Sequence, residues 1–101
     1  MMKIIEKVYV ENCKIYKRGK VYILRLPQSI YQYIRNCQNC KIIGIEITIP
    51  NTNFAIPLTV NKIQYDKYPY IYLSTKLNML WEELKERYDQ VTTILIVEKL
   101  S

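Results

Sequence analysis

Hydrophobic and polar residues alternate along this chain in two patterns, one typical of strands and the other of short helices. Stretches rich in β-branched residues and tyrosine favour β-strands. The longer ones are 3–10, 21–26, 41–49, 54–60, 68–73 and 90–100, and shorter strands are expected at 13–16 and 62–65. The chain is therefore expected to be mainly β, of the α+β class.

Helices and turns separate these strands. Apolar residues three and four positions apart predict amphipathic helices at about 27–36 and 74–88. Glu11 and Asn12 are expected to end the first strand. The basic residues around Gly19 form a turn, since glycine adopts positive φ without strain, and the polar residues 50–53 form another.

The second half of the chain has the same order of elements as the first. Residues 42–60 read as a hairpin, and Pro57 predicts that its second strand lies at a sheet edge or contains a bulge. Displacing the later half by about 48 positions aligns the two ββαβ units, so we expect one domain, 1–101, with internal repeats at about 3–49 and 54–100. If 42–60 joins the copies, the first and last strands should pair as its counterpart.

Composition narrows the function classes. The 101 residues suit a single domain, half of them are apolar, and the formal charge of +6 favours an anionic partner. Histidine is absent, and the chain contains neither a glycine-rich phosphate loop nor a Ser/His or Cys/His pair. We therefore expect a binding protein without a cofactor rather than an enzyme. With neither a membrane-length apolar run nor a signal-peptide pattern, we expect a cytoplasmic protein.

The segment Gly19-x5-Arg25-Leu26-Pro27-x2-Ile30 carries a family resemblance. With the helix and hairpin that follow it, this segment resembles the MazE-type antitoxins of the AbrB/SpoVT superfamily. The resemblance implies a swapped-hairpin β-barrel, here a pseudo-dimer within one chain, and sequence-specific binding of double-stranded DNA in transcription regulation. The second copy departs from the motif, with Ser74 at the proline position. The bias toward Ile, Lys, Tyr and Asn also resembles proteins of crenarchaeal viruses, which implies the host cytoplasm.

Basic residues concentrate in the first half. Residues 1–50 contain nine Lys or Arg and three Asp or Glu, whereas residues 51–101 contain six of each. Because Lys and Arg neutralise phosphates and Arg pairs with guanine, the expected DNA contacts are Lys14, Lys17, Arg18, Lys20 and Arg25. The alternative is a solvated turn with an edge-strand Arg that deters aggregation. Because only one copy is basic, a DNA-binding protein of this kind would need to form a homodimer to present a second set of basic residues to the DNA.

Tyrosines provide a second hypothesis. Tyr68, Tyr70 and Tyr72 alternate onto one strand face, where they would stack nucleic-acid bases or, as the simpler interpretation, fill the core. The competing function is a protein-interaction module, antitoxin-like or a viral host-factor binder, that uses the Tyr-rich second repeat. An acidic helix face would then dock the partner, through Glu82, Glu83 and Glu86.

Cysteines leave three alternatives open. Cys37 and Cys40 have the spacing of a zinc knuckle, but Cys13 is the one further cysteine, and a zinc site usually needs four ligands. Cys37 and Cys40 would otherwise form a disulfide or remain as two free thiols at a helix end, and the free thiols are the preferred interpretation. No metal site is assigned.

Overall fold

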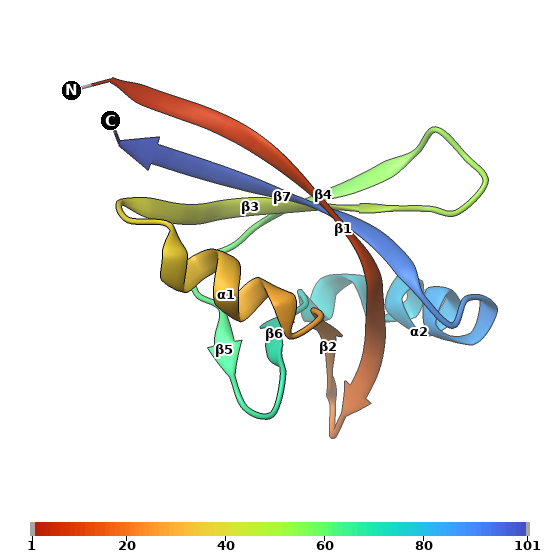
Figure 1. Ribbon diagram of the computed structural model, residues 1–101. Coiled ribbons are helices and arrows are strands. Elements are labelled where there is room, and N and C mark those ends of the chain that lie inside the picture. Colours follow the sequence, from red (N-terminus) through yellow and green to blue (C-terminus); the bar gives the residue numbers. More distant parts are fainter. Residues whose placement is uncertain (1, 101) are drawn as a thin grey trace.

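A computed structural model of the chain describes residues 2–100 and shows seven strands with two short α-helices (Figure 1). The elements, in chain order, are β1 (Lys3–Arg18), β2 (Val21–Arg25), α1 (Ser29–Asn36), β3 (Cys40–Thr48), β4 (Ala55–Thr59), β5 (Gln64–Tyr65), β6 (Pro69–Tyr72), the 3-10 turn η1 (Thr75–Leu77), α2 (Asn78–Arg87) and β7 (Val91–Leu100). The predicted order of strands and helices is confirmed, except that the strands expected at 3–10 and 13–16 form the single strand β1, and the fold is a small α+β structure.

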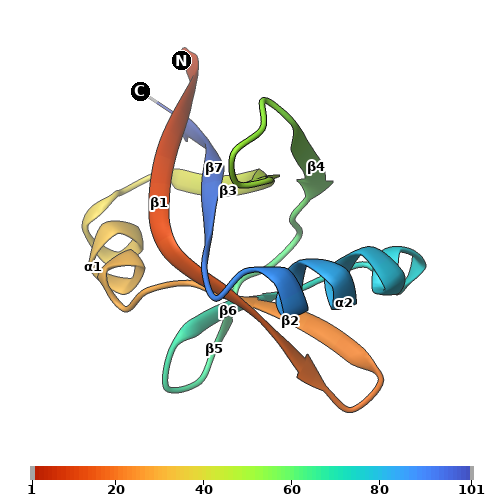
Figure 2. The same ribbon diagram turned by 90° about the vertical axis from the view of Figure 1, so that its right-hand side faces the viewer.

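The strands form one antiparallel sheet in the order β4-β3-β7-β1-β2-β6-β5. The long strand β1 belongs to two parts of this sheet, as Figure 2 shows. Its first part pairs with β7, and β3 and β4 complete what we call the terminal half-sheet. Its last part, Lys14–Arg18, pairs with β2, and β6 and β5 complete the hairpin half-sheet.

A β-bulge at Glu11 and Asn12 lets β1 pass from one half-sheet to the other. The register shifts between Val10 and Cys13, and Asn12 has a φ of 64°. Asparagine tolerates this left-handed conformation better than most residues, and a bulge bends its strand. The prediction that Glu11 and Asn12 end the first strand was therefore wrong, because they bend it instead.

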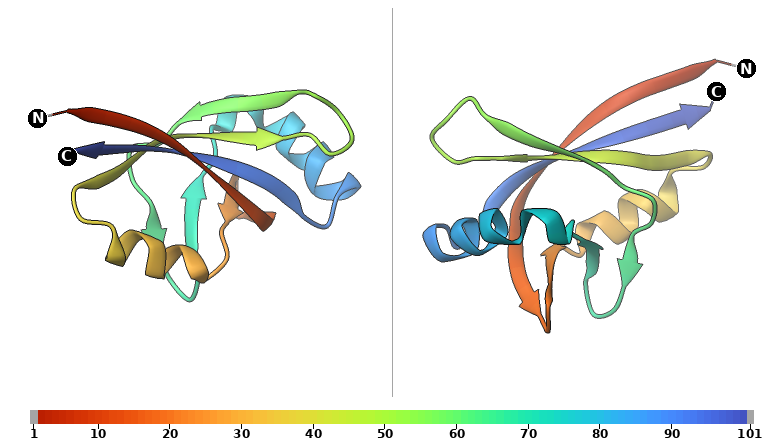
Figure 3. Two further views of the ribbon diagram at one scale, coloured as in Figure 1. Left: turned by 45° about the horizontal axis from the view of Figure 1, so that its top comes forward. Right: turned by 180° about the vertical axis from the view of Figure 1, so that it is seen from behind.

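The first and last strands lie side by side, as predicted from the repeat (Figure 3). β1 pairs with β7 over Lys3 to Val10, antiparallel, and β3 pairs with β4 as the predicted hairpin. β4 is an edge strand, which explains how it accommodates Pro57. The edge position of Pro57 is confirmed.

The hairpin half-sheet is joined at its centre by a symmetric pair of backbone hydrogen bonds. The amide of Leu26 donates to the carbonyl of Pro69 at 2.8 Å, and the amide of Leu73 donates to the carbonyl of Tyr22 at 2.9 Å. Within residues 2–100, β4 and β5 each pair with one strand and not with each other. The sheet is therefore open, and the prediction of a closed barrel was wrong: the two-residue β5 is too short to meet the opposite edge.

The core lies between the two half-sheets and α2. Trp81 is fully buried on α2, and its indole N–H donates to the Ser74 carbonyl at 2.8 Å. Helix α1 buries only Ile30 fully. The largest aliphatic side chains without exposure come from β2, β3 and β7 and the residue after β2: Leu24, Leu26, Ile45, Ile47, Leu95 and Val97. Over residues 2–100, neither α-helix has the length and apolarity needed to span a membrane.

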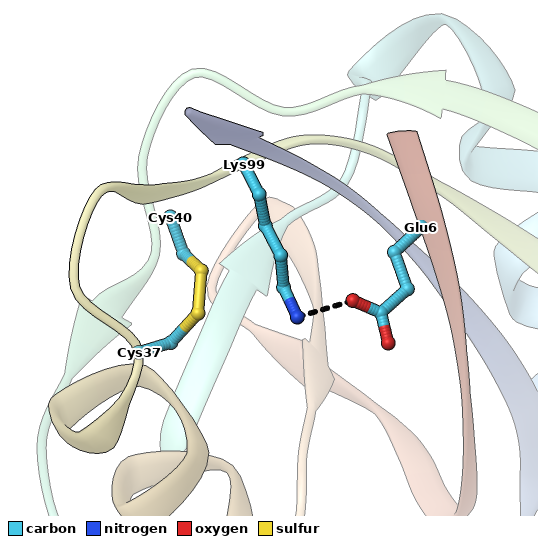
Figure 4. The surroundings of a disulfide bond; sticks show 4 residues. All are labelled: Glu6, Cys37, Cys40 and Lys99. Atoms are coloured by element: carbon cyan, nitrogen blue, oxygen red, sulfur yellow. Dashed lines mark ion pairs between the residues drawn. A yellow bond between two sulfur atoms is a disulfide. The ribbon is translucent and has the colours of Figure 1, made fainter. Parts of the chain in front are cut away.

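A disulfide joins Cys37, after the end of α1, to Cys40 at the start of β3 (Figure 4). This decides among the three alternatives for the cysteines and corrects the preferred interpretation of free thiols. In the same view, Lys99 of β7 forms an ion pair with Glu6 of β1. The hydrogen bond to Glu6 raises the pKa of Lys99, because it stabilises the ammonium form.

Candidate nucleic-acid interface

One face of the hairpin half-sheet covers the core and the other faces outward. Alternation along the strands places Ile15 and Leu24 in the core and Arg18 and Arg25 on the outward side. The outward side is hollowed into a groove of about 480 Å³. The residues that line it are Tyr16, Lys17, Arg18, Ile23, Arg25, Asp66, Lys67, Tyr68 and Tyr70.

Arg25 is held between two aromatic rings in this groove. Its guanidinium carbon lies 4.6 Å from the centre of the Tyr16 ring and 4.5 Å from that of Tyr68. Both distances are within the range of cation–π attraction. Because the rings restrict the rotamers of a long side chain, Arg25 loses less conformational entropy when it contacts a ligand.

Arg18 lies on a third ring and beside a carboxylate. Its guanidinium carbon is 4.7 Å from the centre of the Tyr70 ring, and an Nη atom is 3.9 Å from an Asp66 oxygen. A hydrogen bond to Tyr70 raises the pKa of Arg18, with a smaller contribution from Tyr72. Arg18 therefore carries its positive charge throughout the physiological pH range.

The three predicted lysines lie in different positions. Lys14 pairs with Arg25 across β1 and β2, and its ammonium is 5.1 Å from the Tyr16 ring centre. Lys17 lines the rim of the groove and also a second hollow beside α2. Lys20 lines that second hollow, where its carbonyl accepts a hydrogen bond from the Asn78 side chain at 3.3 Å. The structure thus brings Lys14, Arg18 and Arg25 together, and places Lys20 apart from them.

Sequence reasoning missed the residues that hold the two arginines. Tyr16, Asp66 and Lys67 were not proposed for the site, yet they line the groove. A usable signal existed for Tyr16, because it alternates with Arg18 on β1 and must share its face. No such signal existed for Asp66 and Lys67, which reach the groove only through pairing of β6 with β2.

Tyrosines extend the outward face along β6. Tyr70 and Tyr72 meet edge to face with ring centres 5.5 Å apart, and Tyr72 is 50 % exposed. The predicted alternation of these side chains onto one face is confirmed by this contact. Tyr72 is next to the tyrosines that bind the arginines, so aromatic rings and guanidinium groups form one continuous surface.

The remaining predicted features do not assemble into a site. Within the described chain, 2–100, no group of three or more His, Cys, Asp or Glu side chains is placed to hold a metal ion. On α2, Glu83 forms an ion pair with Arg87 at 2.9 Å, as is common on an exposed helix face. Glu82 is half-buried there.

Comparison of the chain with protein-family models, with curated proteins and with solved structures gives no match. The resemblance to the AbrB/SpoVT superfamily therefore stays a prediction, and the groove must be interpreted from its own chemistry.

Proposed function

We propose that this chain is a DNA-binding protein that regulates transcription in the manner of AbrB- and MazE-type proteins. The observation that carries the proposal is the outward groove of the hairpin half-sheet, where Arg18 and Arg25 are held against tyrosine rings with Lys14 beside them. A cluster of fixed cations on a soluble domain attracts an extended anion, and DNA is the polyanion that the resemblance implies.

The cations of the groove have two roles in this proposal. Lys14 and Lys17 neutralise phosphates and set the position of the protein on the duplex. Arg25, whose guanidinium lies against two rings, pairs bidentately with the O6 and N7 atoms of guanine. Binding at a promoter, without a catalytic step, is the proposed activity.

We also infer that the chain is an internal pseudo-dimer of the swapped-hairpin type. The supporting observation is the symmetric pair of hydrogen bonds at Leu26 and Leu73, together with a matching order of pairing in both half-sheets. Asp66 and Lys67 occupy the turn that corresponds to the basic turn of the first half. A homodimer would therefore supply a second basic groove for a second half-site.

The test is a titration of random-sequence duplex DNA at about 50 and 200 mM salt, conditions between which phosphate-dependent binding weakens steeply. The Arg18→Gln/Arg25→Gln variant is compared with Lys7→Gln/Lys85→Gln, which removes two positive charges from exposed positions outside the groove. We expect tight binding at low salt, a loss of about tenfold or more in the arginine variant, and a smaller loss in the lysine variant.

Two results would contradict the proposal. Absence of binding at low salt would exclude general DNA affinity. Equal losses in the two variants would show that net charge alone, and not the groove, attracts DNA. Circular dichroism of both variants checks that each keeps the fold.

A further inference from the structure

The position of Arg25 has a tyrosine counterpart in the second half of the chain. Leu24 and Ile71 pair at the centre of the β2–β6 contact, so Arg25 and Tyr72, the next residue of each strand, occupy equivalent positions. A groove built only to neutralise a duplex backbone would need cations on both sides. On the β1–β2 side the groove has Lys17, Arg18 and Arg25, whereas on the β5–β6 side it has one cation, Lys67, together with the carboxylate of Asp66 and the rings of Tyr68 and Tyr70.

Aromatic rings on an open sheet face offer a specific kind of contact. The bases of an unpaired strand expose their flat faces and stack on tyrosine, whereas the bases of a duplex already stack on one another. Tyr72 is the ring available for this contact, since it is half-exposed, while Tyr70 is covered by Arg18 at 4.7 Å. A duplex would gain little from Tyr72.

The position of Tyr72 relative to the cations suits an unpaired strand. Tyr72 touches Tyr70, on which Arg18 lies, and Tyr70 pairs with Arg25 across β2 and β6. A base stacked on Tyr72 would therefore have its own or the next phosphate near Arg18 or Arg25. The groove next to Tyr72 has a volume of about 480 Å³, which is within the range of small-ligand sites, roughly 300–1,000 Å³.

We propose that the groove binds an unpaired nucleic-acid strand, with a base stacked on Tyr72 and phosphates on Arg18 and Arg25. This inference rests on the proposed function, because it uses the same groove, and it makes an opened or single-stranded segment the preferred ligand. Base faces and phosphates are common to DNA and RNA. The proposed contacts therefore select an unpaired strand over a duplex but do not distinguish DNA from RNA.

Fluorescence anisotropy at one salt concentration tests it with three probes: a thymidine oligomer, a uridine oligomer and a duplex. Each probe is about 12 nucleotides or base pairs long, within the ~4–16 nucleotides that one small β-fold covers. We expect at least one single strand to bind tighter than the duplex. The affinities of the thymidine and uridine oligomers show whether DNA or RNA binds more tightly.

Variants at one position separate stacking from charge. Tyr72→Ala should weaken single-strand binding by about fivefold to 100-fold and change duplex binding by less than about twofold. Tyr72→Phe keeps the ring and should restore single-strand affinity. Tyr9→Ala is the matched control, because Tyr9 is 71 % exposed on the terminal half-sheet.

The outcomes distinguish the two proposals. Duplex binding that equals or exceeds binding of both single strands, or single-strand binding unaffected by Tyr72→Ala, would overturn this inference and leave the proposed function intact. Failure of all three probes to bind would overturn both. Single-strand preference that is lost in Tyr72→Ala and kept in Tyr72→Phe supports it.

Discussion

The two halves of this chain have a similar order of strands and helices and different side-chain chemistry. In the first half, β1 and β2 bring Arg18 and Arg25 to the outward groove, whereas β6 of the second half brings Tyr70 into the groove and places Tyr72 beside it. Backbone pairing depends on hydrogen bonds that any residue except proline can supply. The outward side chains are therefore free to differ without loss of the sheet.

The two helices also differ, and here the second half contributes more to the core than the first half does. Helix α2 of the second half buries Trp81 and Leu84 in the core, while α1 of the first half buries Ile30 alone among its residues. The first half thus carries the whole net charge of +6, and the second half carries the largest core side chain. Net positive charge and the main stabilising side chain are therefore divided between the two halves.

The largest expected effect tests this division directly. Trp81→Ala should lower the free energy of unfolding by about 3–5 kcal/mol, because it removes a fully buried indole and leaves a cavity. Ile34→Ala, at the position aligned with Trp81 on α1, should cost less, since Ile34 is half-buried. Urea denaturation followed by circular dichroism measures both. Equal losses would contradict the division between the halves.

A smaller effect is expected from the disulfide, which is present in the first half only. Cys37 and Cys40 close a loop of very few residues, so reduction should destabilise the protein by about 2 kcal/mol or less. Urea midpoints with and without dithiothreitol measure the change, and the Cys37→Ser/Cys40→Ser variant should not respond to the reductant.

Cys13 should remain unlabelled by iodoacetamide in the folded state, because burial raises the pKa of its thiol.

The smallest effect concerns the one carboxylate in the groove. Asp66 lies 3.9 Å from Arg18, and both side chains are exposed to solvent, so this ion pair contributes little to stability. Asp66→Asn should therefore leave the urea midpoint nearly unchanged. It should raise DNA affinity about twofold to fivefold, because it removes a negative charge that faces the phosphates.

Asp89→Asn provides the control for this prediction. Asp89 is exposed just after α2, and its substitution changes the net charge by the same amount. A similar gain in affinity from Asp89→Asn would assign the effect to net charge. An unchanged affinity in Asp66→Asn would place the DNA outside the groove.

Much of the fold was predictable because its signals are local. Strand alternation and helical periodicity located the elements, and the order of the two ββαβ units predicted that the first and last strands pair. The bulge at Asn12 was not predictable in this way, since a polar pair inside a β-branched run looks the same whether it ends a strand or bends it. The open edge at β5 depends on strand length, which sequence patterns define poorly.

The site was predictable in part. Arg18 and Arg25 were assigned to the site from their charge, but Arg18 was expected in the turn; it ends β1, and the β1–β2 register places it on the same face as Arg25. The rings of Tyr68 and Tyr70 reach the arginines through pairing of β2 with β6, two strands that lie far apart in sequence. Lys20 was assigned to the site because it is close to Arg18 in the chain, but the turn directs it toward α2.

The position of β7 between β1 and β3 has a consequence for how the chain folds. In the terminal half-sheet, β7 (Val91–Leu100) lies between β1 and β3, so one edge of each of these strands has no partner until that segment is present. Contacts between segments so far apart raise the contact order and slow folding. A chain that ends before Val91 would leave two apolar strand edges open for pairing with other molecules, which makes aggregation the expected fate of C-terminal truncations.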